Sequence, residues 1–195
     1  MRLLALATER LTVAGYRHIG LDHFALPEDD LTRALDSDSL HRNFMGYTTH
    51  ANCDLIGLGV SAISHVGDSY SQNHRGLPEW EVAVDQGRLP TWRGIALDAD
   101  DIIRADVIQQ VMCRGVIDRR VIENRHDIAF DEYFGKALSQ LATLQRDGLV
   151  EIDSERITVT SRGRLLLRMI AMCFDRYLQT PAAAQAERPR HSRVI

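Results

Sequence analysis

Residues 54–64, with the sequence DLIGLGVSAIS, place the strongest constraint on the fold of this chain. The run is apolar, contains β-branched side chains and is interrupted by Gly57 and Gly59. These features predict a buried strand that enters a turn, where backbone can approach another group closely. Ring-bearing polar residues flank the run, which suits a site for a cofactor or a flat ligand. The alternative is an ordinary core strand followed by a tight turn.

Composition restricts the class of protein. The chain has 195 residues, of which 45% are hydrophobic, and this suits one or two small domains. A net charge of −4 argues against a protein devoted to nucleic acid or to anionic membranes. Residues 165–174 form an apolar run that is too short to span a bilayer. Because Cys53, Cys113 and Cys173 lie 60 residues apart, they suit neither a metal clip nor a disulfide framework. We therefore expect a soluble, cytoplasmic protein.

The N-terminal segment predicts a helix followed directly by a strand. Apolar residues recur at helical spacing in residues 2–14, and Gly15 is a suitable terminating residue. Residues 16–25 then predict one strand, so the chain begins as half of an α/β repeat. Asp22 and His23 could form an acid–base pair at the end of that strand. We favour the alternative that these neighbours face opposite ways.

The second half predicts helices around a short hairpin. Residues 76–98 contain glycines, prolines and two tryptophans, and predict an irregular connector. We expect a helix from Asp98 or Asp100 to Cys113, ended by Gly115. Further expected elements are a helix or turn at 118–124, an amphipathic helix at 130–144, a hairpin at 149–152 and 156–160, and a helix at 161–178. This order is typical of a winged-helix-like module.

A winged helix raises the possibility of DNA binding. The presumed recognition helix, residues 130–146, carries Asp131 and Glu132 against Lys136 and Arg146. Because this helix is neutral, it cannot neutralise many phosphates. We therefore expect no nucleic-acid partner, and instead a packing or lid module.

Several segments resemble one enzyme family closely. They include GLDHFALPEDDL, HRNF-GYTT, GLGVSAIS, WRGIAL, DDIIRADVI, DGLVEID and the terminal SRVI, so the resemblance extends along nearly all of the chain. These sequence motifs are similar to those of the oxygen-independent coproporphyrinogen III oxidases, which are radical S-adenosylmethionine enzymes of haem biosynthesis. An upstream half of those enzymes carries a three-cysteine motif for the iron–sulfur cluster, and this chain has no such motif. The resemblance therefore implies the C-terminal part of such an enzyme.

The resemblance implies an α+β fold, in which the closing strands and helices of a partial parallel (β/α) radical-enzyme barrel precede a helical winged-helix-like domain. The expected division is residues 1–75 for the barrel portion, 76–98 for the connector, 99–178 for the winged-helix-like domain and 179–195 for a tail.

The resemblance also implies which residues reach the active site. It assigns Phe44, Met45 and Ile63 to the cofactor-binding site and places Ile63 beside bound S-adenosylmethionine, where Ile63 would pack on an adenine or sugar face. Met45 belongs to the same segment but stands where the family pattern NFQGY has glutamine. A thioether offers polarizable apolar surface instead of the hydrogen bonds of an amide. A metal site built from His41, His50, Cys53, Asp54 and His65 is not expected, because their spacing matches no compact ligand pattern.

For the complete enzyme, the resemblance implies that a reduced [4Fe-4S] cluster cleaves S-adenosylmethionine to a 5′-deoxyadenosyl radical. That radical takes a hydrogen from a propionate of coproporphyrinogen III, and loss of carbon dioxide and an electron leaves a vinyl group. Two rounds give protoporphyrinogen IX. The implied partners are this substrate and the missing N-terminal radical domain, in cis or in trans, so the chain alone should be inactive. The alternative is a non-enzymatic haem or porphyrin carrier, or a docking module.

Overall fold

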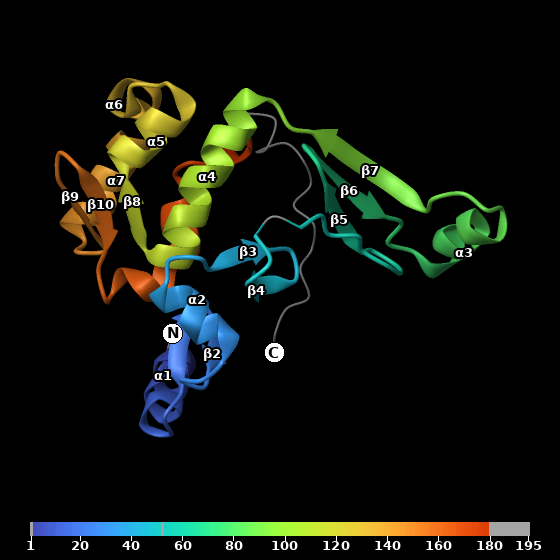
Figure 1. Ribbon diagram of the computed structural model, residues 1–195. Helices are drawn as coiled ribbons and strands as arrows, with labels where there is room; N and C mark the ends of the chain where they lie inside the picture. The colour runs from blue at the N-terminus through green and yellow to red at the C-terminus, as the bar shows by residue number, and fades with distance from the viewer. Residues whose placement is uncertain (1, 52, 180–195) are drawn as a thin grey trace. The chain divides into compact units, whose positions relative to one another are not determined.

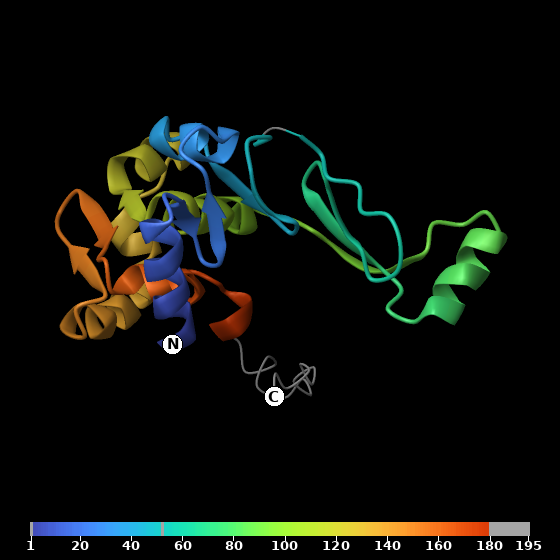
Figure 2. The same cartoon turned by 90° about the horizontal axis from the view of Figure 1, so that it is seen from below.

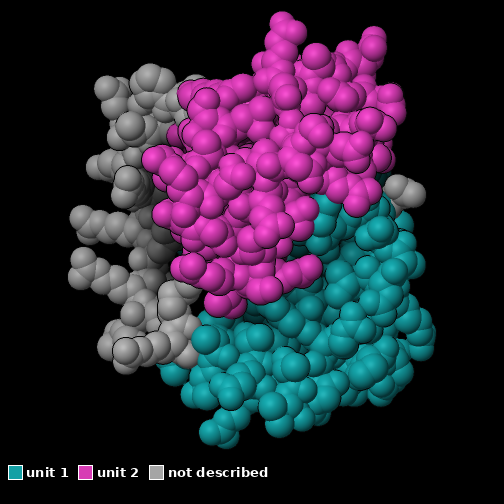
Figure 3. Space-filling model, turned by 90° about the vertical axis from the view of Figure 1, so that its left-hand side faces the viewer, with its two compact units in different colours: residues 1–117 teal, residues 118–195 magenta. Residues whose placement is uncertain are grey.

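The computed structural model describes residues 2–51 and 53–179. The chain divides into two compact units, residues 1–117 and residues 118–195, which Figure 3 distinguishes by colour. Both units combine helices with short strands, so the fold is a mixed α and β one, as expected. Within the described residues, no helix has the length and apolar character needed to cross a membrane. Of the expected tail, residues 180–195 lie outside the described part of the chain.

The first unit begins with a helix and a hairpin. Helix α1 (Arg2–Val13) precedes the antiparallel pair of β1 (Arg17–Gly20) and β2 (His23–Ala25). The prediction of one strand over residues 16–25 was therefore wrong. The chain reverses at Leu21, which adopts a φ of +50° although it is not glycine. Helix α2 (Asp30–Asp36) follows, and its N-cap residue Asp29 accepts a hydrogen bond from the backbone N–H of Leu31.

Helix α4 (Ala99–Arg114) packs against the hairpin of β3 (His41–Asn43) and β4 (Gly46–Thr48). The Tyr47 hydroxyl donates a 2.8 Å hydrogen bond to the carbonyl of Met112, which ties the hairpin to the helix. The surrounding core consists of Ile19, Ala25, Ala34, Leu40, Tyr47 and Cys113. The helix was predicted correctly, since Asp98 caps it and Gly115 ends it with a φ of +70°.

Strands β5 (Ile63–Val66), β6 (Ser69–Asn73) and β7 (Thr91–Ala96) form an antiparallel sheet. Figures 1 and 2 show these strands side by side, with α3 (Leu77–Asp85) at one end. Residues 76–98, for which the sequence predicts irregular structure, thus supply a helix and a strand. The segment folds in this way because β7 completes the backbone hydrogen bonding of β6.

The run at residues 54–64 is not the buried strand that the sequence predicts. Ile56 and Leu58 are 71% and 89% exposed. Leu55 forms an isolated antiparallel bridge to His65, so the run folds back beside β5 instead of continuing it. Gly57 allows this return, because a Cβ there would lie only 2.6 Å from the carbonyl oxygen of Ile63. Gly57 therefore serves a close backbone approach within the chain itself, whereas Gly59 adopts a φ of +101° with open space around it.

The second unit contains α5 (Arg119–His126), α6 (Phe130–Tyr133), α7 (Gly135–Arg146) and α8 (Leu167–Met172), together with the 3₁₀ turns η1 (Gly163–Leu166) and η2 (Tyr177–Gln179). Strands β9 (Val150–Ile152) and β10 (Arg156–Val159) form the predicted hairpin, and with β8 (Val116–Asp118) they give the sheet order β8-β10-β9.

The core of the second unit is built on aromatic rings. The rings of Phe130, Phe134 and Phe174 are buried, and adjacent centroids lie 4.8 and 5.4 Å apart. Two helix predictions were too long in this unit. The stripe at 130–144 is divided between α6 and α7 at Phe134, whose φ and ψ of −103° and 19° are not helical. The expected helix at 161–178 is divided among η1, α8 and η2.

Candidate functional site

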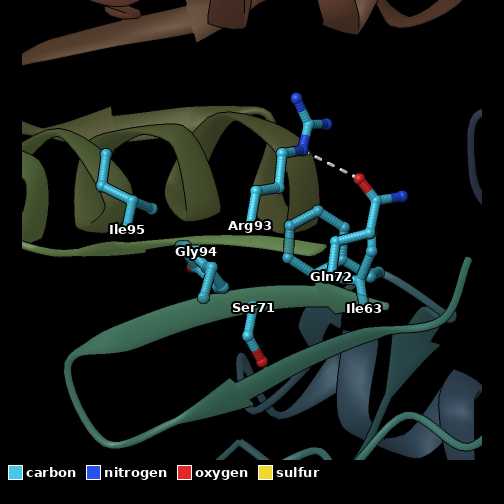
Figure 4. Close-up of a pocket in the computed structure, with 8 residues that line it drawn as sticks. Ile63, Ser71, Gln72, Arg93, Gly94 and Ile95 are labelled. Carbon is cyan, nitrogen blue, oxygen red and sulfur yellow. Dashed lines mark hydrogen bonds between the residues drawn. The ribbon is translucent and has the colours of Figure 1, made fainter. Parts of the chain in front are cut away.

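A pocket of about 370 Å³ lies on one face of the β5-β6-β7 sheet, in the first unit (Figure 4). The residues that line it come from all three strands and from the turn between β3 and β4: Phe44, Ile63, Tyr70, Ser71, Gln72, Arg93, Gly94 and Ile95. The pocket therefore joins the HRNFMGYTT segment to the end of the GLGVSAIS segment, which the sequence places 19 positions apart at Phe44 and Ile63.

The register of the three strands explains why these side chains meet. Ile63 lies opposite Gln72, and Gln72 lies opposite Arg93, so the three form one row across the sheet. Tyr70 lies opposite Ile95 in the neighbouring row on the same face. Side chains two residues apart on a strand share a face, which brings both rows to the pocket. Figure 4 shows Gln72, Arg93 and Ile95 on one side of the sheet, with Ser71 directed away from them.

The aromatic part of the pocket is a contact between Phe44 and Tyr70. Their rings meet edge to face with centroids 5.2 Å apart, although Phe44 remains 53% exposed. The ring of His65 also packs against that of Tyr70, with the two centroids 4.4 Å apart. Burial raises the pKa of the Tyr70 hydroxyl, and the negative charge of Asp101 raises it further. The phenol is therefore neutral near pH 7 and can donate a hydrogen bond.

The polar part of the pocket is centred on Arg93. Its Nε–H donates a 3.0 Å hydrogen bond to Oε1 of Gln72, which Figure 4 marks with a dashed line. The guanidinium carbon also lies 4.7 Å from the centroid of the Trp92 ring, and that of Arg75 lies 5.1 Å from the same ring. Within residues 2–51 and 53–179, no carboxylate forms an ion pair with Arg93.

The structure brings together two of the three predicted site residues. Phe44 and Ile63 both line the pocket, whereas Met45 does not. The Met45 side chain is 80% exposed, and its backbone N–H donates a 2.9 Å hydrogen bond to Oδ1 of Asn43 within the turn. Sequence reasoning missed Arg93 and Ile95, because it assigned both to the connector. Their spacing of two residues in TWRGIA, typical of one strand face, was the available signal.

A second polar group joins α4 to β3. The Gln109 side chain donates to the carbonyl of Arg42 and accepts 3.2 and 3.3 Å hydrogen bonds from the Arg42 backbone N–H and the Cys113 thiol. Its Nε2 lies 3.4 Å from Nε2 of His41. Burial lowers the pKa of His41, and the charge of His65 lowers it further. Because Gln109 satisfies backbone groups, this cluster holds the β3–β4 hairpin in place.

The other candidate groups do not form a catalytic or metal centre in the described structure. Asp22 and His23 contact each other, with 3.2 Å between Oδ1 and Nδ1, because Asp22 lies in the turn before β2. The expectation that they face apart was therefore wrong. Throughout residues 2–51 and 53–179, no three His, Cys, Asp or Glu side chains gather closely enough to hold a metal ion.

Comparisons with known proteins find relatives that match the whole of this chain. A family model described as the HemN C-terminal domain matches residues 97–166. The oxygen-independent coproporphyrinogen III oxidase of Pseudomonas aeruginosa is 46% identical over 195 residues, which is 100% of this chain and 41% of the relative. The protein of the same name from Escherichia coli K12 is 49% identical over 185 residues, which is 95% of this chain and 40% of the relative.

A solved structure supports the same assignment. Its title is "Coproporphyrinogen III oxidase (HemN) from Escherichia coli is a Radical SAM enzyme", and it matches with a TM-score of 0.85 and 49% identity. The match covers 90% of this chain and 40% of that one. This chain spans about two fifths of the length of the curated relatives named above. The resemblance seen in the sequence is thereby confirmed: the chain matches the C-terminal part of the oxygen-independent coproporphyrinogen III oxidases along nearly its whole length.

Proposed function

We propose that the chain acts as the C-terminal part of a cytoplasmic enzyme that converts coproporphyrinogen III to protoporphyrinogen IX by oxidative decarboxylation of two propionates. The observation that carries this proposal is the meeting of Phe44 and Ile63 in one pocket. The family resemblance assigns both residues to the active-site wall, and they come from separate segments of the chain. Their convergence supports an active-site role for this face of the sheet.

The pocket fits the organic cofactor of the family. Phe44, Ile63 and Ile95 offer apolar surface for a ring or a sugar, and Arg93 offers a positive charge. Bound in the complete enzyme, S-adenosylmethionine would supply the radical that begins the oxidation of a propionate. The side chains of Ile63 and Phe44 would pack against the bound molecules and exclude water from them. Met45 contributes an exposed thioether next to the pocket in place of the family's amide.

The described residues do not fit the iron–sulfur cluster. Cys113 and Cys173 are buried while Cys53 is exposed, and the three do not gather into a ligand set. The cluster ligands belong to an N-terminal radical domain, joined in cis or supplied in trans, and the chain alone has no oxidase activity.

The finer architecture is also a proposal. The element order α4, β8, α5, α6, α7, β9, β10, with the sheet order β8-β10-β9, supports a winged-helix-like domain over residues 99–178. The family model match at residues 97–166 supports nearly the same bounds. We assign residues 1–75 to the closing portion of the catalytic barrel, residues 76–98 to the connection and the winged-helix-like domain to packing or lid closure.

A chimeric enzyme tests the proposed function. The C-terminal 40% of the Escherichia coli relative that matches this chain would be replaced by residues 1–195. Under anaerobic conditions with S-adenosylmethionine and an electron donor, the chimera is expected to form protoporphyrinogen IX, detected by porphyrin fluorescence after oxidation. The relative truncated before the matched stretch serves as the negative control.

The proposal fails if a folded chimera with a full cluster makes no product while the parent enzyme does. Tight haem or porphyrin binding by this inactive chimera would then favour the carrier function.

A further inference from the structure

We infer that Arg93 is a carboxylate-binding residue of the pocket and that Gln72 is its positioning residue. The ligand is an amphipathic molecule that places an apolar body on the sheet and a carboxylate on the guanidinium. This inference rests on the proposed function, because that function supplies two such molecules. They are S-adenosylmethionine, which has an amino-acid carboxylate, and a porphyrinogen, which has propionates.

Charge is the first support. Of the eight described residues that line the pocket, Arg93 is the one with an ionised side chain near pH 7. It is exposed, and no described carboxylate neutralises it in an ion pair. The pocket therefore presents a positive charge beside apolar surface, which complements an anionic group on an apolar ligand.

The orientation of the guanidinium is the second support. Nε donates its hydrogen to Gln72, while Nη1 and Nη2 make no hydrogen bond to any described residue. These two nitrogens form a planar fork that matches the two oxygens of a carboxylate. The ring of Trp92, with its centroid 4.7 Å from the guanidinium carbon, supports the group further. Arg93 is thus held by two contacts that leave its bidentate edge available.

The apolar neighbours define the rest of the ligand. Ile63 lies beside Gln72 in the same row of the sheet, and Ile95 is two residues from Arg93 on the same face. Phe44 adds an exposed ring at the edge of the pocket. A ligand that reaches Arg93 therefore contacts aliphatic and aromatic surface as well. A small inorganic anion would leave that surface uncovered.

Binding measurements on the 195-residue chain test the inference. Calorimetry at low ionic strength would give the affinity for S-adenosylmethionine. Fluorescence quenching would give the affinity for coproporphyrin III, a stable analogue of the porphyrinogen. Arg93→Gln should weaken binding of the recognised ligand by about ten- to a hundredfold. Arg93→Lys should weaken it less, because the charge remains without the fork. Gln72→Leu should have an intermediate effect.

The chain contains a matched control in Arg88. Its guanidinium also donates to a glutamine side chain, with 3.0 Å between Nε and Oε1 of Gln86, but Arg88 does not line the pocket. Arg88→Gln should leave both affinities unchanged. Equal losses in Arg88→Gln and Arg93→Gln would show a nonspecific charge effect and overturn the inference.

Two further ligands distinguish the source of the carboxylate. If Arg93 binds the cofactor, Arg93→Gln weakens the binding of S-adenosylmethionine but not the binding of its decarboxylated form. If Arg93 binds the substrate, the variant weakens the binding of coproporphyrin III. Binding of the porphyrin whose propionates are converted to amides is then unchanged. The inference is overturned if the variant changes neither affinity, or if the unaltered chain binds neither ligand at about 1 mM.

The outcome is separable from that of the proposed function. An active chimera in which Arg93→Gln changes neither KM nor ligand affinity would reject the role of Arg93 while retaining the oxidase function. A chimera without activity would reject the function, whatever Arg93 binds.

Discussion

His41 is a residue whose ionisation reports on the neighbourhood of the pocket. Burial and the nearby His65 both lower its pKa from the ordinary 6.5. The folded protein therefore favours the neutral imidazole. The contribution of neutral His41 to the stability of the folded protein is therefore complete above pH 6.5. It is lost as the pH falls through the lowered pKa.

Replacement of His65 tests this electrostatic contact. We expect His41 to titrate below pH 6.5 in the unaltered chain, and His65→Gln to raise its pKa because a positive neighbour is removed. The measurement is NMR titration of the imidazole Hε1 resonances. His50→Gln should leave the pKa of His41 where it was. An unchanged midpoint in His65→Gln would contradict the proximity of the two rings.

Ionisation of the Cys113 thiol makes the free energy of unfolding depend on pH in the alkaline range. Burial raises the pKa of its thiol from 9.0 to about 12, against the opposing charges of Arg42 and Arg114. Because the unfolded thiol ionises first, this contribution to stability is complete below pH 9 and is lost as the pH rises towards 12. The loss should be about 1.4 kcal/mol per pH unit at most.

Urea unfolding at several pH values would measure that loss. The free energy of unfolding should fall more steeply above pH 9 in the unaltered chain than in Cys113→Ala. The variant lowers stability at every pH by removing buried volume, so the comparison concerns slopes alone. Parallel slopes would show that the thiol is not protected from ionisation.

At the scale of the elements, the start of α4 depends on a reciprocal pair of hydrogen bonds. Asp98 Oδ1 accepts from the backbone N–H of Asp101 at 2.9 Å, and Asp101 Oδ2 accepts from that of Asp98 at 3.2 Å. Asp98→Ala should lower the free energy of unfolding by about 1 kcal/mol. Asp98→Asn should lower it much less, because the asparagine side-chain oxygen can still cap the helix. Denaturant titration of both variants checks this, and equal losses would refute the capping role.

This helix also shows what the sequence can predict. Its cap and its terminal glycine act within a few residues, so they were recognisable without tertiary structure. The reversal at Leu21 had no such signal, because a positive φ at leucine is disfavoured and is imposed by the surrounding fold. The row Ile63, Gln72 and Arg93 depends on strand pairing across 30 residues, which no local pattern specifies.

At the scale of the whole molecule, we expect the catalytic parts to be divided between this chain and a partner domain. We expect the isolated chain, after anaerobic treatment with iron and sulfide, to show no stoichiometric [4Fe-4S] absorbance. It should also form no protoporphyrinogen IX. The reason is that its described cysteines do not form a ligand set. Product formation by the chain alone would overturn this division.

The effect of Ile63→Ala on the chimera's kcat/KM tests most directly whether the pocket on the β5-β6-β7 sheet belongs to the active site. If this pocket forms part of the active-site wall, the variant should lose about tenfold or more while its iron content stays the same. Ile56→Ala is the matched control, because Ile56 is 71% exposed and lies outside the pocket. Its kcat/KM should equal that of the unaltered chimera. Equal activity in all three proteins would contradict the claim that this face of the sheet meets the reactants.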